Sequence, residues 1–430
     1  MRPSDLEAIA ELLGEAADAT GGIAQDTHEA IADRAFGATG SLGRPARLIH
    51  DGISRAVYAG VRTGLRTGAR QAGRVVARSL PEDAPALGAG SAGEAIALGA
   101  IQGFAGDLLD ERESPLATTL GLRLDGRPIL PDPPSLVAAY PGATDRLVVF
   151  LHGLCETEYA WNGLPRITDR GQRRLELRTT GRRPARFPDG LATDLEMTPL
   201  MVRFNSGRHI SDNARDLVAL LSAAVEAWPV PVREITLIGH SMGGLIARSA
   251  AWQGRGEPWA ALVRHVVCLG TPHHGADLEQ GVHLLDWALG QTRETRAFSK
   301  ALRLRSAGIK DLRFGSAAEE DWHGQDPDEL MRRRAAEVPF LPHADYCWIS
   351  ASLTSGHVGR LLGDLLVREP SASGAGRGRH LPFELENGRS FHGLTHFDLL
   401  DHPAVYEQLV AWLSRPARLT ASPETSTQAH

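Results

Sequence analysis

The 430-residue sequence has very little cysteine, very little lysine and no long apolar run, and each shortage narrows the classes of protein it fits. Its three cysteines, Cys155, Cys268 and Cys347, are odd in number and far apart, which favours free thiols in a reducing compartment over a disulfide framework. No stretch approaches about 18 consecutive apolar residues, so we expect no transmembrane helix. The first residues lack the basic and apolar segments of a signal peptide, so we expect a cytoplasmic protein.

The charge balance of the chain argues against nucleic acid as its main partner. The net charge is -6, and only two of the 46 basic residues, Lys300 and Lys310, are lysines. Because alanine and glycine are also abundant, we interpret the many arginines as a compositional bias rather than as anion-binding sites. With 42% hydrophobic residues, the chain is long enough for one large α/β core and an additional region.

Residues 1–115 are predicted to form an N-terminal helical region with a connector. Within it, residues 47–80 form a basic amphipathic helix, because apolar and arginine side chains each recur every four residues. The two rows are Ile49, Ile53, Val57, Val61 and Leu65, and Arg62, Arg66, Arg70, Arg74 and Arg78. Two interpretations are open: peripheral contact with an anionic membrane surface, or packing of the apolar row on the rest of the protein while the arginines face solvent.

Three glycines of the same helix, Gly60, Gly64 and Gly68, also recur every four residues. Each weakens a helix by about 1 kcal/mol relative to alanine. Their regular spacing therefore predicts the close approach of another backbone.

Residues 116–415 are predicted to form the main domain, in which strands and helices alternate. Apolar strands are predicted at 146–151, 199–204, 235–238, 265–270 and 346–351, with a weaker candidate at 382–386. Short units of this kind give an α/β fold with a mostly parallel sheet flanked by helices on both faces. We interpret the strand-free insertion 276–341 as a helical lid or cap, and residues 416–430 as a disordered tail.

The chemistry is predicted to centre on Ser241, in the sequence Gly239-His240-Ser241-Met242-Gly243. This G-x-S-x-G pattern follows a predicted strand and precedes a predicted helix, which is the context of a nucleophile turn. The sharp turn holds the serine in a strained backbone region, and the glycines two residues away on either side avoid a clash of Cβ atoms. Ser241 is therefore predicted to stand clear of the sheet.

A serine hydroxyl needs a base to remove its proton, and the base needs an acid to fix its tautomer. In this type of fold the chain order is serine, acid, histidine. The candidate bases are His380, His392, His396 and His402. We choose His396 because it lies just before the final amphipathic helix, whereas His402 fits the start of that helix.

The predicted acid is Asp364, which lies between the last clear strand and His396. Asp345 is less suitable because it begins its strand, at the end of the sheet opposite to the nucleophile. Asp398 and Asp401 follow the histidine and are weaker candidates for the same role.

The oxyanion of an acyl-transfer intermediate needs two N–H donors, which we assign to the amides of Met242 and Leu154. Leu154 follows Gly153 in the loop after the first parallel strand. Cys155 in the same loop lacks the context of a nucleophile turn. The adjacent His273 and His274 point apart on a predicted turn, and no further ligands complete a set, so no metal site is predicted.

With these residues placed, the chain resembles the α/β-hydrolase superfamily, and more narrowly the bacterial lipases and esterases related to PGAP1-like hydrolases. The motifs that carry the resemblance, over roughly 117–415, are His152-Gly153, the nucleophile turn with Gly244, Gly270-Thr271-Pro272-His273, Gly363-Asp364 and Leu394-Thr395-His396. The resemblance implies hydrolysis of a small-molecule or lipid carboxylic ester without a cofactor. Two alternatives remain open: acyl transfer to an alcohol by the same residues, and a non-catalytic lipid-binding protein at a membrane surface.

Overall fold

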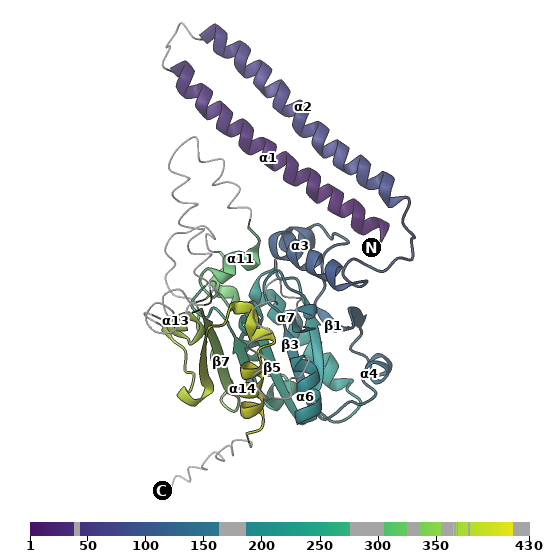
Figure 1. The fold of residues 1–430 in the computed structure, drawn as a ribbon, viewed down its shortest axis with the longest axis vertical. Coiled ribbons are helices and arrows are strands. Elements are labelled where there is room, and N and C mark those ends of the chain that lie inside the picture. Colours follow the sequence, from purple (N-terminus) through teal and green to yellow (C-terminus); the bar gives the residue numbers. More distant parts are fainter. Residues whose placement is uncertain are drawn as a thin grey trace, which may run out of the picture.

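A computed structural model of the chain describes residues 1–37, 44–162, 186–275, 305–324, 336–353, 364, 367, 369–376 and 379–415. Its centre is an eight-stranded sheet with the order β10-β7-β6-β5-β3-β4-β1-β2 (Figure 1). The strands are β1 Gly121–Leu124, β2 Arg127–Ile129, β3 Arg146–Leu151, β4 Thr198–Arg203, β5 Glu234–His240, β6 Val263–Leu269, β7 Asp345–Ser352 and β10 Gly388–His392. The strands from β10 to β4 are parallel, and β1 pairs antiparallel with both β4 and β2. The predicted α/β-hydrolase fold is confirmed.

The central strands are apolar on both faces of the sheet. Along β3, the side chains of Val148 and Phe150 join one hydrophobic cluster, whereas Leu147, Val149 and Leu151 join the other. All five are fully buried. This double burial explains why the central strands appear in the sequence as continuous apolar runs rather than as alternating patterns.

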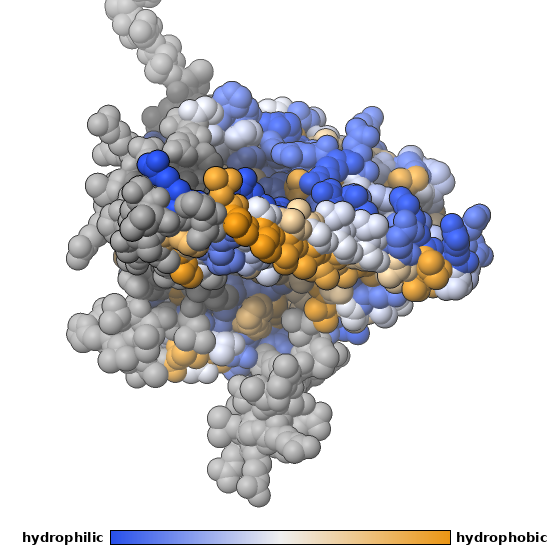
Figure 2. All heavy atoms as spheres, turned by 90° about the horizontal axis from the view of Figure 1, so that it is seen from above, coloured by the Kyte–Doolittle hydropathy of each residue, from blue (hydrophilic) through white to orange (hydrophobic). Residues whose placement is uncertain are grey.

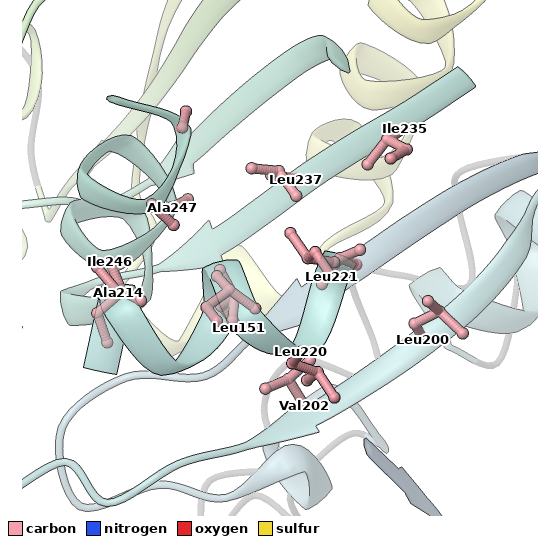
Figure 3. Packing of buried hydrophobic residues seen from close by; sticks show 14 of the residues in the cluster. Leu151, Leu200, Val202, Ala214, Leu220, Leu221, Ile235, Leu237, Ile246 and Ala247 are labelled. Atoms are coloured by element: carbon pink, nitrogen blue, oxygen red, sulfur yellow. The ribbon is translucent and has the colours of Figure 1, made fainter. Parts of the chain in front are cut away.

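Helices cover both faces of the sheet. The covering helices are α4 Pro133–Ala139, α6 Phe187–Leu195, α7 Ile210–Glu226, α8 Met242–Gln253 and α14 Pro403–Leu413. Helices α7 and α8 pack on the face that includes Leu151, and Figure 3 shows their side chains meeting those of β3, β4 and β5. Helices α6 and α14 pack on the opposite face.

The chain order of the strands reverses at β3, in the middle of the sheet. From β3 the chain moves outward to β4 and then returns to the other side of β3, where it forms β5. In open parallel sheets, ligands bind beyond the carboxyl ends of the strands at such a reversal. The loops that follow β3 and β5 therefore meet where a substrate site is expected.

One predicted strand is wrong. Residues 382–384 have no regular structure, and a short 3₁₀ helix occupies Leu385–Asn387. The last strand is instead β10, whose residues are polar or only half-buried because it lies at the edge of the sheet. A short polar edge strand lacks the apolar run that identifies a central strand, so the sequence pattern did not indicate it.

Shorter elements complete the described chain. They are the helices α11 Ala307–Leu312 and α13 Glu369–Ala372, the 3₁₀ helices η2 Glu158–Asn162, η3 Pro258–Leu262, η4 Glu319–Asp321 and η6 His396–Leu400, and the pair β8 Ala375–Gly376 and β9 Arg379–His380. Most of the predicted lid, 276–304 and 325–335, lies outside the described residues, as does the tail 416–430. The described part of the lid region contacts α3 (Ala92–Glu111), with Ser306 donating to the carbonyl of Gly103.

Two long helices, α1 Pro3–Gly37 and α2 Arg44–Ala77, form an antiparallel pair that projects from the main body (Figure 1). Several arginines of α2 make ion pairs with acidic residues of α1. Arg62 contacts Asp18 at 2.8 Å, and Arg70 contacts Glu11. These arginines are therefore not simply solvated, because they hold the two helices together. No described helix is both long and apolar enough to span a membrane.

The apolar row of α2 does not pack on the main body. Ile49, Ile53, Val57, Val61 and Leu65 are each 50–65% exposed, and hydrophobic residues form a band across the face seen in Figure 2. The glycine row in α2 is equally open, since a Cβ atom at Gly60, Gly64 or Gly68 would meet nothing within 4 Å. The predicted close approach of another backbone at these glycines is wrong for the described chain. Membrane contact through residues 47–80 stays a prediction.

Helix α3 packs directly against the loops of the sheet. A Cβ atom at Gly99 would lie 2.7 Å from the carbonyl oxygen of Cys155, and one at Gly103 would lie 2.2 Å from the Cys155 Sγ. A Cβ atom at Gly106 would lie 1.9 Å from Asn205 Oδ1. The face of α3 that contacts these loops therefore requires glycine at positions 99, 103 and 106. The predicted N-terminal region thus contains a helix that supports the loops after β3 and β4.

We expect opposite effects from two alanine substitutions in α2. Gly64→Ala should raise the free energy of unfolding by about 1 kcal/mol, because the methyl group meets open space and alanine favours the helix. Gly73→Ala should lower it by about 1–3 kcal/mol, because its Cβ would lie 2.3 Å from that of Ala10 in α1. Urea unfolding followed by circular dichroism measures both. A loss of stability in Gly64→Ala would show that another group packs on this face.

Candidate active site

Ser241 lies in a strained turn between β5 and α8. Its backbone has φ 52° and ψ -118°, a region that non-glycine residues rarely adopt. The turn is possible because its flanking glycines leave no side chains in the way: a Cβ atom at Gly239 would lie 2.3 Å from the carbonyl carbon of Gly243, and one at Gly243 would lie 2.4 Å from the Leu151 oxygen. Ser241 remains partly exposed, whereas both neighbouring residues are buried.

His396 and Asp364 are in direct contact. His396 Nδ1 lies 2.7 Å from Asp364 Oδ2, and both side chains are almost fully buried. The other carboxylate oxygen of Asp364 accepts the Val367 N–H at 2.7 Å, which fixes its orientation. Because a carboxylate only accepts, Nδ1 of His396 carries the proton in the neutral ring, and Nε2 keeps a lone pair.

Of the other candidate histidines, His380 is exposed in β9, and His392 and His402 are engaged elsewhere. His392, at the end of β10, has its Nδ1 2.7 Å from Ser352 Oγ. His402 caps α14, where its side chain accepts the Ala404 N–H. Asp398 caps the 3₁₀ helix that begins at His396, by accepting the Thr395 N–H.

Close packing brings the loops of Ser241 and His396 together. The residue before the nucleophile, His240, has its Nε2 3.2 Å from the carbonyl oxygen of His396. The Ser241 N–H donates to Leu269 at the end of β6. The next residue, Gly270, has φ 59°, and a Cβ atom there would lie 2.9 Å from His396 Cε1. The histidine ring therefore occupies the space that a side chain at position 270 would need.

The two predicted oxyanion donors both lie at the carboxyl ends of the central strands. Met242 begins α8 directly after Ser241, and Leu154 follows Gly153 in the loop after β3. Within the part of the chain that the structure describes, neither the Leu154 N–H nor the Met242 N–H donates to another protein group. The Gly153 N–H is occupied, because it donates to Glu156 Oε2 at 2.6 Å. The backbone N–H groups of Leu154 and Met242 are therefore available to donate hydrogen bonds to a ligand.

The sequence analysis missed a second histidine–carboxylate pair below the first. Glu156 Oε2 lies 3.0 Å from His240 Nδ1, and both side chains are buried. Burial alone would raise the pKa of Glu156, but the charge and hydrogen bond of His240 and the hydrogen bond from the Gly153 N–H together outweigh it, so this pKa lies below its usual value. Burial would lower the pKa of His240, but Glu156, the His396 carbonyl and Asp364 together outweigh that effect and raise it. Glu156 and His240 therefore form an ion pair. In the sequence, the one indication of this pair was an acidic residue three positions after the His152-Gly153 motif.

His152 differs from His240 because burial lowers its pKa instead of being offset by a carboxylate. It is fully buried and its ring stacks on Phe204 at a centroid distance of 3.9 Å. Burial lowers its pKa to about 4, so the ring is neutral at pH 7. Its Nε2 accepts the Phe204 N–H at 3.2 Å, which leaves Nδ1 as the protonated nitrogen, 2.9 Å from the Gly153 carbonyl oxygen.

The remaining motif residues pack the turn after β6 rather than reach the reacting edge. His273 Nδ1 lies 3.0 Å from a guanidinium nitrogen of Arg248, a buried residue of α8. No cluster of three or more metal-ligating side chains occurs among the described residues. Cys155 is a free thiol whose pKa burial raises to about 11, so it is a poor nucleophile.

Comparison with known proteins agrees with this architecture. Residues 143–318 match the family model described as PGAP1-like alpha/beta domain. No curated protein matches the sequence.

Similar solved structures include the lipase of Bacillus licheniformis in its mature form, with 18% identity, 62% of this chain and 91% of that chain covered, and a TM-score of 0.37. An esterase of Pyrococcus furiosus has 13% identity, coverage of 64% and 84%, and a TM-score of 0.34. Phospholipase PlaB of Legionella pneumophila has 14% identity, coverage of 64% and 61%, and a TM-score of 0.35.

Because two buried histidines have lowered pKa values, we expect the free energy of unfolding to fall in mild acid. Burial lowers the pKa of His152 and of His265 in β6 to about 4, from an ordinary value of 6.5. The unfolded chain therefore binds these protons first, and stability is lost as pH falls from about 6.5 towards 4, by up to about 3 kcal/mol for each histidine. Urea unfolding of His265→Gln at several pH values should show a shallower decline than the wild type. Parallel declines would contradict this assignment.

Proposed function

On the basis of the α/β-hydrolase fold and the PGAP1-like match over residues 143–318, we propose that the protein is a serine hydrolase that cleaves carboxylic esters. The observation that carries the proposal is the 2.7 Å contact between His396 and Asp364, at the edge where Ser241 lies in a strained, partly exposed turn. A histidine oriented by a buried carboxylate beside a serine is the arrangement that activates a hydroxyl group.

In the first half of the reaction, Ser241 Oγ attacks the carbonyl carbon of the ester while His396 Nε2 takes the hydroxyl proton. Asp364 holds the Nδ1–H of His396 and stabilises the imidazolium that forms. The negative charge on the carbonyl oxygen is bound by the N–H groups of Leu154 and Met242. The intermediate then collapses, His396 gives its proton to the leaving alcohol, and the acyl group remains on Ser241.

In the second half, water replaces the alcohol. His396 takes a proton from water, the hydroxyl attacks the acyl carbon, and the same two amides bind the new oxyanion. Collapse returns the proton to Ser241 Oγ and releases the carboxylic acid. The reaction uses no cofactor. An alcohol in place of water would give acyl transfer, which is the alternative reaction of the same groups.

We propose a small-molecule or lipid ester as the substrate and a cytoplasmic location. Contact of residues 47–80 with a membrane surface remains a separate prediction, because the chemistry does not depend on it. A non-catalytic lipid-binding role is the least favoured alternative, since the strained turn at Ser241 and the buried His396–Asp364 pair have no purpose in simple binding.

The first test is hydrolysis of p-nitrophenyl esters of increasing acyl length. Ser241→Ala should lower kcat by about 10⁴-fold or more, because it removes the nucleophile. His396→Asn should cost a similar factor, whereas the matched change His392→Asn in the same segment should leave kcat near the wild-type value. Turnover that survives Ser241→Ala would overturn the proposal. Added alcohol that diverts the acyl group from water would favour acyl transfer.

A second test concerns the space around His396. Gly270→Ala should lower kcat by about 10²-fold, because its Cβ would lie 2.9 Å from the ring and displace it. Gly324→Ala is the matched control: its φ of 70° is equally unfavourable for alanine, but its Cβ would meet nothing within 4 Å. Both variants should lose stability, and only the first should lose activity. Equal kcat values in the two variants would argue against His396 as the base.

A further inference from the structure

The peptide unit between Gly153 and Leu154 is held on its carbonyl side. The Gly153 oxygen lies 2.9 Å from His152 Nδ1 and 3.3 Å from the Glu156 amide nitrogen. Because the Phe204 N–H donates to the other ring nitrogen of His152, Nδ1 is the nitrogen that carries the hydrogen. Both contacts therefore donate hydrogen bonds to the same carbonyl oxygen.

This fixes the direction of the Leu154 N–H. In a planar trans peptide the C=O and the following N–H point in opposite directions. A Gly153 carbonyl held by His152 and Glu156 turns the Leu154 N–H to the opposite side of the peptide, where no described protein group accepts it. Gly153 itself lies beside the nucleophile, since a Cβ atom at this position would be 3.1 Å from Ser241 Cβ. A reversed peptide would present the carbonyl, which repels an oxyanion.

The Glu156 side chain holds the other end of the same residue. Its Oε2 accepts the Gly153 N–H at 2.6 Å and lies 3.0 Å from His240 Nδ1. The second nitrogen of His240 lies 3.2 Å from the carbonyl oxygen of His396. One carboxylate thus connects the loop after β3, the nucleophile turn and the histidine loop.

The charge of Glu156 needs compensation at this location, because a buried carboxylate next to a developing oxyanion would oppose it. His240 faces an acceptor at both ring nitrogens, which requires a doubly protonated, cationic ring. The other charged groups nearby are Asp364, which contacts His396, and Glu158, which pairs with Arg203 at 2.6 Å. The Glu156–His240 pair therefore carries no net charge.

We propose that Glu156 is a positioning residue, which together with His152 and His240 holds the Gly153–Leu154 peptide in the orientation that offers the Leu154 N–H to the oxyanion. This role rests on the proposed hydrolase function, and it adds residues that do not touch the substrate. Helix α3 closes the loop from behind, since a Cβ atom at Gly99 would lie 3.0 Å from the Glu156 backbone.

The test compares Glu156→Ala, Glu156→Gln and Glu158→Gln with the wild type on a p-nitrophenyl ester. Glu156→Ala should lower kcat by about 10²-fold with KM changed by less than about threefold, the loss typical of one oxyanion donor. Glu156→Gln keeps an oxygen acceptor and should recover part of the rate. Glu158→Gln is the matched control, because it alters a buried, ion-paired carboxylate two residues away and should lower Tm without changing kcat.

A tetrahedral boronic acid inhibitor supplies a readout that a purely structural role would not change. Its Ki should rise in parallel with the loss of kcat in the Glu156 variants, because it uses the same N–H donors. An unchanged kcat and Ki in Glu156→Ala, or an equal loss of kcat in Glu158→Gln, would overturn the positioning role.

A measurement without substrate separates this inference from the proposed function. In histidine-labelled protein, the NMR signal of His240, assigned with His240→Gln, should titrate at a lower pH in Glu156→Gln than in the wild type, because the carboxylate that favours the imidazolium is gone. Identical titrations would overturn the ion pair, and with it the positioning role. A wild type that hydrolyses no ester would overturn the proposed function, while this titration would still decide the state of the pair.

Discussion

Close approach of backbone segments at the carboxyl edge of the sheet is the constraint on which the rest of the structure depends. The loops after β3, β5, β6 and β10 meet there, and at three contacts a missing side chain makes room: Gly153 beside Ser241, Gly243 beside Leu151, and Gly270 beside His396. These contacts are tight, so small shifts in one strand would move the neighbouring loop. The spacing of the proposed reacting groups is thus set by the sheet itself.

Two histidine–carboxylate pairs lie at the carboxyl ends of these strands and differ in their hydrogen-bond partners. His396 has one carboxylate, Asp364, at Nδ1 and keeps a lone pair at Nε2. His240 has an acceptor at each nitrogen, the second being the carbonyl oxygen of His396, and remains charged. In the proposed reaction, the first pair exchanges a proton during each turnover and the second keeps its proton throughout. Similar residue types gain distinct tasks through their partners.

The sequence was most informative where one local rule determined the structure. Continuous apolar runs predicted the central strands, and a glycine pattern around Ser241 predicted its turn. Chain order singled out Asp364 and His396, which the structure brings into contact. The missed features depend on partners remote in sequence: β10 is too polar to resemble a strand, the α2 arginines pair with α1, and Glu156 gains meaning only beside His240. Residue patterns do not contain such pairings.

Helix α3 changes where the α/β unit begins. One face of this helix has no side chains at Gly99, Gly103 and Gly106. This face packs against Cys155, Glu156 and Asn205, so α3 supports the proposed oxyanion loop. The family match starts only at residue 143, far beyond this helix. A chain that began at the first matched residue would keep every group proposed to react and lose the surface that holds the Leu154 loop in place. The part of the chain that holds the proposed site together is accordingly larger than the segment that family resemblance delimits.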